Sequence, residues 1–240
     1  MRKVVLKVKE NTALNACTYK MVLMGDCGKM RAGQFVEVAV EGHYLRRPFS
    51  IADIDGNELT LLYKVVGGGT LDLSKAVRGD RFDVLTELGN SFDTARSNMP
   101  LLVGGGIGIA PLYALAKAFA AAGKDMTIVL GFRNKEEAFF IEEFKALGKV
   151  IVATDDGSLG VKGNVLTAIN KGLEFDFYYA CGPMVMLKAV ANFSKRGQVS
   201  LEAHMGCGFG ACMGCSVPTL HGSKRICKEG PIFDAGEVIF

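Results

Sequence analysis

Apolar residues in the first third of the chain fall in short runs rich in Val, Leu, Ile and Tyr, with Gly, Asp and Asn between them. Short runs of this kind at regular spacing are typical of the strands of a small antiparallel barrel. We therefore predict a β-barrel domain over residues 1–96, with the strand pattern continuing to about Val84. Its expected strands are KVVLKVKE (3–10), YKMVLMG (19–25), GQFVEVAV (33–40), PFSIADI (48–54) and ELTLLYKVV (58–66).

The pattern changes after Pro100, where apolar runs alternate with amphipathic segments. LLVGG (101–105) is predicted to be a buried strand, and PLYALAKAFAAAG (111–123) a helix with Pro at its first turn and Gly past its end. This alternation predicts a doubly wound, parallel α/β domain over residues 97–200. Its further expected elements are strand 125–132, helix 136–148, strand 149–156, helix 164–174, strand 176–182, helix 183–197 and a last strand, 198–205.

The composition describes a globular protein with a small appendage, which we place at residues 201–240. A length of 240 residues suffices for two domains with proper cores. The net charge is +3 with both signs interspersed, so nothing indicates a nucleic-acid surface, and no apolar run approaches the roughly 20 residues of a membrane span. The start MRKVVLKVKE lacks the apolar core of a signal peptide, and seven cysteines are an odd number for disulfides, so we expect a cytoplasmic location.

Four cysteines near the C-terminal end carry the most specific chemical signal. Cys207, Cys212, Cys215 and Cys227 form the pattern C-x4-C-x2-C-x11-C, the plant-type spacing of the ligands of a [2Fe–2S] cluster, in which each iron takes two thiolates. Glycines in this segment suit a backbone that wraps a small inorganic core and aims N–H groups at sulfur. A four-thiolate zinc site and disulfide bonds are the alternatives, although zinc usually takes two cysteine pairs of similar spacing.

Two segments of the predicted barrel have the chemistry of a diphosphate or flavin site. Arg47-Pro48-Phe49-Ser50 begins a strand with an arginine suited to a charge-assisted fork on a diphosphate. On the next strand, Lys64-Val65-Val66 runs into Gly67-Gly68-Gly69-Thr70, whose backbone N–H groups favour an anion ahead of the helical stretch 71–77. The alternative is a surface Arg47 that pairs with a carboxylate.

The predicted α/β domain carries two further candidates, each at the end of a strand. The run Gly104-Gly105-Gly106-Ile107-Gly108-Ile109-Ala110-Pro111 stands between a strand and a helix, where backbone N–H groups meet a pyrophosphate. It differs from the spaced G-x-G-x-x-G fingerprint, which indicates a nucleotide fold other than the standard Rossmann unit. Cys181-Gly182-Pro183 follows a later strand, at the edge where open α/β sheets bind ligands. The alternatives are a tight packing turn and a core thiol.

In this order the motifs resemble those of the ferredoxin–NADP reductase superfamily, which joins an FAD-binding barrel with an R-x-[YF]-[ST] motif to an NAD(P)-binding domain with G-G-G-x-G-x-A-P and C-G-P motifs. The C-terminal segments HMGCGFGACMGCSVP and ICKEGPIFDAGEVIF resemble, more narrowly, the family of electron-transfer subunits of NAD-dependent dihydroorotate dehydrogenases. This second resemblance spans the whole chain.

The resemblance implies a ligand for each motif. The residues implied for FAD are Arg47, Pro48, Phe49, Ser50, Lys64, Val65, Val66, Gly69 and Thr70. Those implied for NAD are Gly104, Gly105, Gly106, Gly108, Ala110, Pro111, Cys181, Gly182 and Pro183, and those for the [2Fe–2S] cluster are Cys207, Cys212, Cys215 and Cys227. The resemblance also implies a partner, an FMN-containing catalytic subunit that oxidises dihydroorotate in pyrimidine biosynthesis. Electrons would pass from its FMN through the cluster and FAD to NAD+, within a heterotetramer, and no catalytic residue is expected on this chain.

Two other functions stay open on the sequence. One is a ferredoxin-linked NAD(P) oxidoreductase subunit of the same superfamily, and the other is a zinc-stabilised binding module. NAD is not distinguished from NADP, because Arg133 and Lys135 suit a 2′-phosphate and a solvated loop equally. We expect the cysteine loop to form an apolar partner interface with Met205, Phe209 and Met213. The three histidines, His43, His204 and His221, lack a motif.

Overall fold

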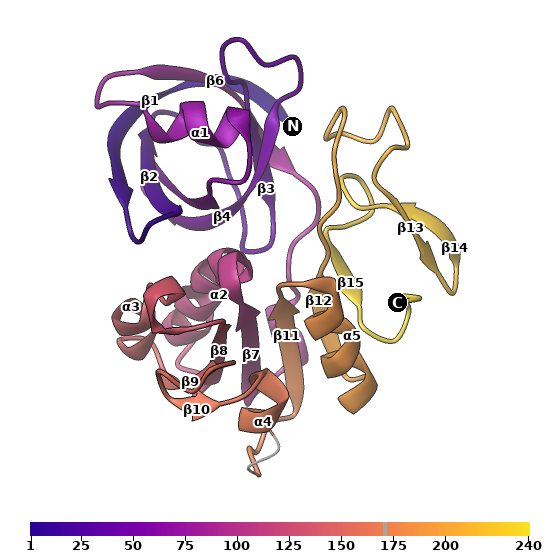
Figure 1. Cartoon of the computed structure of the whole chain (residues 1–240). Helices are drawn as coiled ribbons and strands as arrows, with labels where there is room; N and C mark the ends of the chain where they lie inside the picture. The colour runs from indigo at the N-terminus through magenta and orange to yellow at the C-terminus, as the bar shows by residue number, and fades with distance from the viewer. Residues whose placement is uncertain (170–171) are drawn as a thin grey trace.

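The computed structural model describes residues 1–169 and 172–240. Figure 1 shows a barrel, an α/β layer beneath it and a C-terminal segment that lies along one side of both. This arrangement confirms the predicted fold class of an antiparallel barrel followed by a parallel-sheet domain. None of the described helices is long and apolar enough to cross a membrane.

The barrel is closed by six antiparallel strands in the order β1-β2-β5-β4-β3-β6. Sequence analysis singled out five of them and missed β6, although the alternation of its apolar residues with Arg81, Asp83 and Glu87 is the period of a half-buried strand. Pairing of β6 with both β1 and β3 closes the barrel. The strands are β1 (Arg2–Ala13), β2 (Thr18–Met24), β3 (Phe35–Val38), β4 (Arg47–Asp55), β5 (Glu58–Lys64) and β6 (Arg81–Leu88), and helix α1 (Gly68–Ser74) follows β5.

The period of two along β4 separates the barrel core from its outer surface. Phe49 and Ile51 point inward and are buried, whereas Ser50 between them, on the opposite face, is only partly covered. The core that Phe49 and Ile51 join also contains Leu61 and Tyr63 of β5. This alternation leaves the outward side chains of β4 available for a ligand.

The second domain is a seven-stranded sheet in the order β10-β9-β8-β7-β11-β12-β15. After β7 the chain builds three strands on one side of it, and it then returns to place β11 and β12 on the other side, so the sheet is doubly wound as predicted. The switch point lies between β7 and β11, where open α/β sheets bind ligands. Its strands are β7 (Pro100–Gly105), β8 (Thr127–Phe132), β9 (Lys149–Thr154), β10 (Val161–Lys162), β11 (Phe177–Cys181), β12 (Gly197–Ser200) and β15 (Ile232–Asp234).

Two of the predicted helices are shorter than expected. Instead of one helix over 136–148, the structure has two short ones, separated by Phe140 in the left-handed region at φ 61°. Phe139 and Phe140 are buried against other aromatic rings, so tertiary packing overrides the helical pattern. In the predicted helix 164–174, residues 165–169 are helical, positions 170–171 lie outside the described residues, and 172–174 are described but not helical. The helices are η1 (Thr94–Arg96), η2 (Gly106–Ile109), α2 (Ala110–Ala121), η3 (Lys135–Glu137), α3 (Ile141–Lys145), α4 (Val165–Ile169) and α5 (Met184–Phe193).

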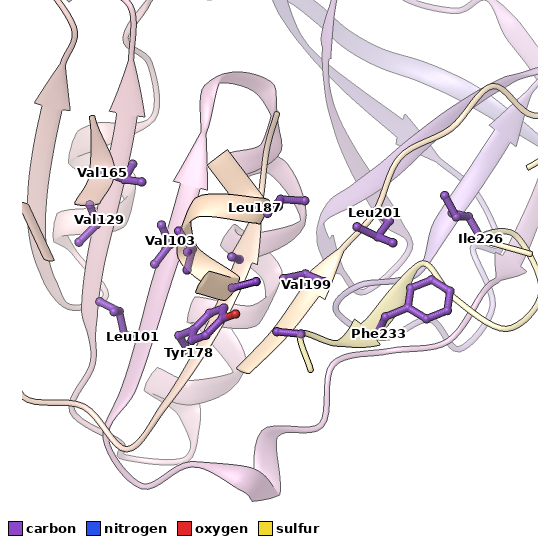
Figure 2. Close-up of a cluster of buried hydrophobic side chains, with 14 of the residues drawn as sticks. Leu101, Val103, Val129, Val165, Tyr178, Leu187, Val199, Leu201, Ile226 and Phe233 are labelled. Carbon is purple, nitrogen blue, oxygen red and sulfur yellow. The ribbon is translucent and has the colours of Figure 1, made fainter. Parts of the chain in front are cut away.

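The C-terminal segment returns to the sheet. After the hairpin of β13 (Ser216–Thr219) and β14 (Gly222–Arg225), β15 pairs antiparallel with β12. The prediction that the strand beginning at residue 198 is the sheet's last one is therefore wrong, and β15 was missed because three residues are too few to show a period. Figure 2 shows Ile226 and Phe233 of this segment beside Val199 and Leu201, in one core that continues to Val103 and Val129.

A single asparagine joins the end of the barrel to the same C-terminal segment. Asn90, two residues after β6, accepts from the Ile232 N–H at 2.9 Å and donates from its side chain to the carbonyls of Glu229 and Ile232. Its backbone N–H donates to the Gly230 carbonyl at 2.7 Å. Because β15 also pairs with β12, residues 229–234 are bonded both to the barrel's exit and to the sheet.

The buried face of β5 provides a test of the barrel core. We expect Leu61→Ala to lower the free energy of unfolding by about 2–5 kcal/mol, because Leu61 is fully buried and its removal leaves a cavity. Val5→Ala on the exposed face of β1 is the control and should change this free energy by less than about 0.5 kcal/mol. Urea unfolding followed by circular dichroism measures both, and equal losses would show that Leu61 is not in the core.

Candidate functional site

The four predicted cysteine ligands converge in the C-terminal segment as two pairs. The Cys207 thiol lies within hydrogen-bonding reach of the Cys212 thiol, and the Cys227 thiol within reach of that of Cys215. Cys215 and Cys227 are buried, whereas Cys207 is partly covered and Cys212 is exposed. All seven cysteines of the chain are free thiols, so no disulfide competes for these ligands.

Backbone N–H groups point at the sulfurs of this segment. Cys207 Sγ accepts from the N–H of Ala211 at 3.2 Å and of Cys212 at 3.4 Å. Cys215 Sγ accepts from the N–H of Cys227 at 3.4 Å. N–H···S bonds of this kind stabilise negative charge on sulfur and tune the potential of an iron–sulfur cluster.

The arrangement of the cysteines in two pairs fits a binuclear cluster. Within residues 1–169 and 172–240, no three His, Cys, Asp or Glu side chains converge on a point that one metal ion could occupy. A [2Fe–2S] cluster asks for a different arrangement, with two thiolates on each of two irons. The pairs Cys207–Cys212 and Cys215–Cys227 meet that need, one facing solvent and the other facing the core.

The pKa values of two of these thiols, Cys207 and Cys227, shift in opposite directions. Burial opposes ionisation of Cys207, but hydrogen bonds from the backbone of Cys212, Phe209 and Ala211 lower its pKa to about 6. Burial and the neighbouring thiols of Cys215 and Cys207 raise the pKa of Cys227 to about 12. Cys207 is therefore largely a thiolate at neutral pH, which is the form that binds metals.

An arginine connects the two loops that carry these cysteines. Arg225 Nη1 donates to the Gly210 carbonyl at 2.6 Å, while the rest of its guanidinium forms a fork on the Glu229 carboxylate. Hydrogen bonds from Arg225 lower the pKa of Glu229 to about 2, so that carboxyl group is ionised. The contact holds the loop of Cys207 and Cys212 against the loop of Cys227.

A buried carboxyl group of the barrel lies against the cysteine loop. Glu37 in β3 is 1% exposed, and its Oε1 has no hydrogen-bond partner among the described residues. Burial and then the charge of Cys207 raise the Glu37 pKa to about 7. Gly208 packs directly on this carboxyl group, and a Cβ at that position would overlap it. The barrel and the cysteine loop are thus in contact through Glu37 and Gly208.

The predicted flavin residues of the barrel gather around the glycine turn between β5 and α1. The Arg47 guanidinium crosses Gly69 so closely that a Cβ there would overlap it. The Thr70 hydroxyl stays within the turn, where it accepts from the N–H groups of Val66 and Gly67 and donates to the Gly67 carbonyl. Phe49 points into the barrel, against Tyr63, so only its backbone is available to a ligand.

Lys64, the last of the predicted flavin residues on β5, reaches the α/β domain. Lys64 Nζ lies 3.2 Å from Glu137 Oε2 and lines the cleft between the domains. Val65 packs partly on the barrel core, and Val66 beside it is largely exposed. The predicted barrel residues therefore form one surface, which runs from Arg47 at the glycine turn to Lys64 at the cleft.

The cleft lies at the switch point of the sheet and has a volume of about 480 Å³. Gly105, Gly106 and Gly108 line one side, and Gly182 and Pro183 line the other. A Cβ at Gly108 would approach the Cys181 carbonyl oxygen to 2.5 Å, so the two predicted motifs touch and only glycine fits. Gly104, Ala110 and Pro111 lie behind this lining, in the strand and the helix that carry it.

Cys181 itself does not line the cleft. Its side chain is 0% exposed, and burial raises its pKa far above the usual range, so it is a neutral core thiol in this structure. Glu202, which sequence analysis missed, does line the cleft from the loop after β12. Although its side chain is open to solvent at the mouth, the protein around its carboxyl group raises its pKa. Sequence analysis placed Glu202 inside the predicted strand 198–205, whereas the observed strand ends at Ser200 and leaves Glu202 in the following loop.

Charged residues mark the far end of the cleft. Arg133 follows β8 and Asp155 follows β9, and both line the cavity. Lys135, which the sequence left open between a 2′-phosphate contact and a solvated loop, does not line it. The cleft thus offers a carboxylate next to an arginine at the position where the second and third parallel strands end.

Comparison with known proteins defines the class of this site. Residues 102–192 match the family model described as the oxidoreductase NAD-binding domain. The fold is that of the FAD/NAD-binding domain of nitric oxide dioxygenase from Vibrio cholerae, with a TM-score of 0.71 at 20% identity over 81% of this chain and 96% of that one. The chain therefore has the fold of the two-domain flavin- and nicotinamide-dependent reductases.

Two further comparisons include the C-terminal segment. Residues 202–239 match the model described as the iron-sulfur cluster binding domain of dihydroorotate dehydrogenase B. The electron transfer subunit of dihydroorotate dehydrogenase B (NAD(+)) from Fusobacterium nucleatum is 41% identical, with 96% of each chain aligned. The solved structure of an NADH-dependent reduced ferredoxin-NADP oxidoreductase is similar over 98% of this chain and 90% of that one, with a TM-score of 0.91 at 32% identity. The chain belongs to the family of dihydroorotate dehydrogenase B electron transfer subunits.

The contact between Gly208 and Glu37 generates a test of the cysteine loop. We expect Gly208→Ala to lose most of its iron and acid-labile sulfide, because Gly208 has φ +72° and an added Cβ would overlap the Glu37 carboxyl group. Gly214→Ala is the control, since its Cβ would meet only Cys212 Sγ at 3.5 Å, an ordinary contact. Iron and sulfide analysis after anaerobic reconstitution measures both, and full occupancy in Gly208→Ala would contradict the expectation.

Proposed function

We propose that this chain carries electrons between a flavin-containing dihydroorotate-oxidising subunit and NAD+. The proposal rests on one observation. The same chain has a loop with two pairs of cysteines and a cleft of the kind that binds nicotinamide cofactors, and the barrel contacts both. The Gly208–Glu37 contact joins the loop to the barrel, and the Lys64–Glu137 ion pair joins the barrel to the domain that carries the cleft. The full-length similarity to dihydroorotate dehydrogenase B electron transfer subunits supports this reading over a zinc-stabilised module.

The residues proposed to bind ligands form three binding sites. Arg47 and the turn around Gly69 would hold the diphosphate of FAD, with the strand residues up to Lys64 along the rest of the cofactor. Cys207 and Cys212 would bind one iron of a [2Fe–2S] cluster, and Cys215 and Cys227 the other. When bound, flavin exchanges electrons singly or in pairs, an iron–sulfur cluster exchanges them singly, and nicotinamide takes a hydride. The chain's own task is then to place these groups and to exclude water from them.

The cleft at the switch point would hold NAD. The turn at Gly105–Gly108 presents backbone to a pyrophosphate, and Gly182 and Pro183 leave room for a flat ring beside it. Glu202 at the mouth is positioned to accept a hydrogen bond from a carboxamide or a ribose hydroxyl. Asp155 at the far end would accept from a ribose hydroxyl and repel a 2′-phosphate, which favours NAD over NADP.

The exposed side of the cysteine loop is the proposed partner surface. Phe209 is 44% exposed and Met213 is 54% exposed, on the loop that carries the solvent-facing pair Cys207 and Cys212. Large apolar side chains at the surface next to a redox centre favour a protein partner over solvent. A second, FMN-containing subunit seated here would bring its flavin near the exposed cysteine pair, and two copies of each chain would form the predicted heterotetramer.

One observation favours a second function. The similarity to the NADH-dependent reduced ferredoxin-NADP oxidoreductase structure covers nearly the whole chain, cysteine loop included. A ferredoxin-linked role would use the same three binding sites with a different electron donor. The two functions differ in what reduces the chain, so the assay must offer both donors.

The test is to co-express the chain with an FMN-containing dihydroorotate dehydrogenase subunit and to purify the complex anaerobically. We expect a stable complex that reduces NAD+ when dihydroorotate is added. Reduction of NAD+ by reduced ferredoxin alone, from a chain that binds no such subunit, would favour the second function. Absence of both activities from a flavin- and iron-loaded protein would overturn the proposal.

The same complex tests the partner surface. Phe209→Ser should weaken co-purification while leaving the iron content unchanged, because it removes exposed apolar area and keeps the Phe209 backbone, which bonds Cys207, in place. Val77→Ser is the control, since Val77 is also exposed but lies on the barrel, after α1. Equal retention of the partner by both variants would place the interface elsewhere.

Asp155 provides a test of cofactor choice. We expect Asp155→Asn to lower the ratio of kcat/KM for NAD to that for NADP by at least about tenfold, because removing a like charge beside a phosphate relieves more than about 1.4 kcal/mol of repulsion. Asp156→Asn is the matched control, since Asp156 does not line the cleft and accepts hydrogen bonds from Ser158 instead. An unchanged ratio in Asp155→Asn would show that the carboxylate does not face the ribose.

A further inference from the structure

His43, which no sequence motif contains, lies between an arginine and a carboxylate of the barrel. Its Nδ1 is 3.2 Å from Arg47 Nη2, and its Nε2 is 2.9 Å from Asp72 Oδ2. His43 is on the loop before β4, and Asp72 is on α1 after the glycine turn. The imidazole therefore connects the two segments that carry the proposed diphosphate site.

The partners of the ring decide its tautomer. Hydrogen bonds from Lys75 and His43 lower the pKa of Asp72, so its carboxylate is ionised and can only accept. His43 Nε2 must then carry the proton that faces Asp72, which leaves the lone pair of Nδ1 for a guanidinium N–H of Arg47. In this series of hydrogen bonds, His43 donates to Asp72 and Arg47 donates to His43.

The same side chains explain why the turn needs glycine. A Cβ at Gly68 would come within 3.2 Å of His43 Cε1, and a Cβ at Gly69 would overlap the Arg47 guanidinium. The imidazole of His43 and the guanidinium of Arg47 thus both lie close against the backbone of the turn. Displacement of His43 would free Arg47 to leave this position.

The guanidinium keeps donors for a ligand. Arg47 Nη1 donates to the Leu45 carbonyl at 2.5 Å, and Nη2 donates to His43. A guanidinium has five N–H donors, so three have no partner among the described residues. These donors lie beside Gly69, where the proposed function places the diphosphate of FAD.

We propose that Asp72 and His43 are positioning residues for Arg47 in FAD binding. The carboxylate orients the imidazole, and the imidazole holds the guanidinium over the glycine turn, so the arginine is in place before the diphosphate arrives. Preorganisation of this kind raises affinity because less side-chain freedom is lost on binding. The inference rests on the proposed FAD site, and it adds two residues that act through Arg47.

The experiment measures FAD affinity in the full chain after removal of its flavin, by quenching of flavin fluorescence on titration. We expect His43→Leu to raise the dissociation constant at least about tenfold, since it removes a hydrogen bond to a charged group. His43→Asn should recover most of this loss, because its amide oxygen can still accept from Arg47. Lys75→Ala is the control: Lys75 bonds Asp72 on the other side at 2.7 Å, and its removal leaves the His43 contact in place.

A double-mutant cycle with Arg47→Gln separates the inference from the proposed function. If His43 acts through Arg47, His43→Leu should have little further effect on a chain that already carries Arg47→Gln. Additive losses, or no loss in His43→Leu, would overturn the positioning role while the FAD site stands. An Arg47→Gln chain with unchanged FAD affinity would instead overturn the proposed FAD site. Thermal unfolding of each flavin-free variant, compared with the unsubstituted chain, verifies that the fold is intact, and His43→Asn tests the role if His43→Leu does not fold.

Discussion

The arrangement of the three sites depends on how residues 229–234 are held. Four hydrogen bonds with Asn90 attach this segment to the exit of the barrel, and its pairing with β12 attaches it to the edge of the α/β sheet. Because Cys227 lies just before this segment, both attachments constrain where the cysteine loop can lie. The appendage is therefore not a separate unit, and its buried side chains belong to the core of the sheet. A rigid connection of this kind suits electron transfer, which falls off steeply as redox centres move apart.

The three glycine-rich turns are similar in composition, but in each of them a different neighbouring residue leaves no room for a Cβ. A side chain at Gly69 would displace Arg47, one at Gly108 would strike the turn after β11, and one at Gly208 would overlap Glu37. Each neighbour comes from a distant part of the chain. The glycines thus mark places where two elements approach more closely than a Cβ allows, and each place borders one of the proposed ligand sites.

Sequence reasoning identified candidate site residues where the chemistry is local. The spacing of the four cysteines and the order of the strand-ending motifs depend on neighbouring residues, and these gave the cluster loop and the two sides of the cleft. Sequence reasoning was less successful where tertiary packing determines the position of a side chain. Phe49 belongs to the barrel core and Cys181 to the sheet core, although both stand within motifs, because alternation along β4 turns Phe49 inward and because β11 is buried on both faces. His43, Glu37 and Glu202 were missed because each gains its role from a residue far away in the chain.

The amino-acid sequence by itself determined the two-domain architecture, the cysteine pattern and the family resemblance, because periodicity and ligand spacing are properties of short segments. Only the tertiary structure decided how the cysteines pair and at which positions glycine alone fits. It also decided that β15 connects the cysteine segment to the sheet. Those features arise from contacts between residues up to about two hundred positions apart, such as Glu37 with Gly208. No local pattern encodes such a contact, because its strength comes from burial that exists only once the whole chain has folded.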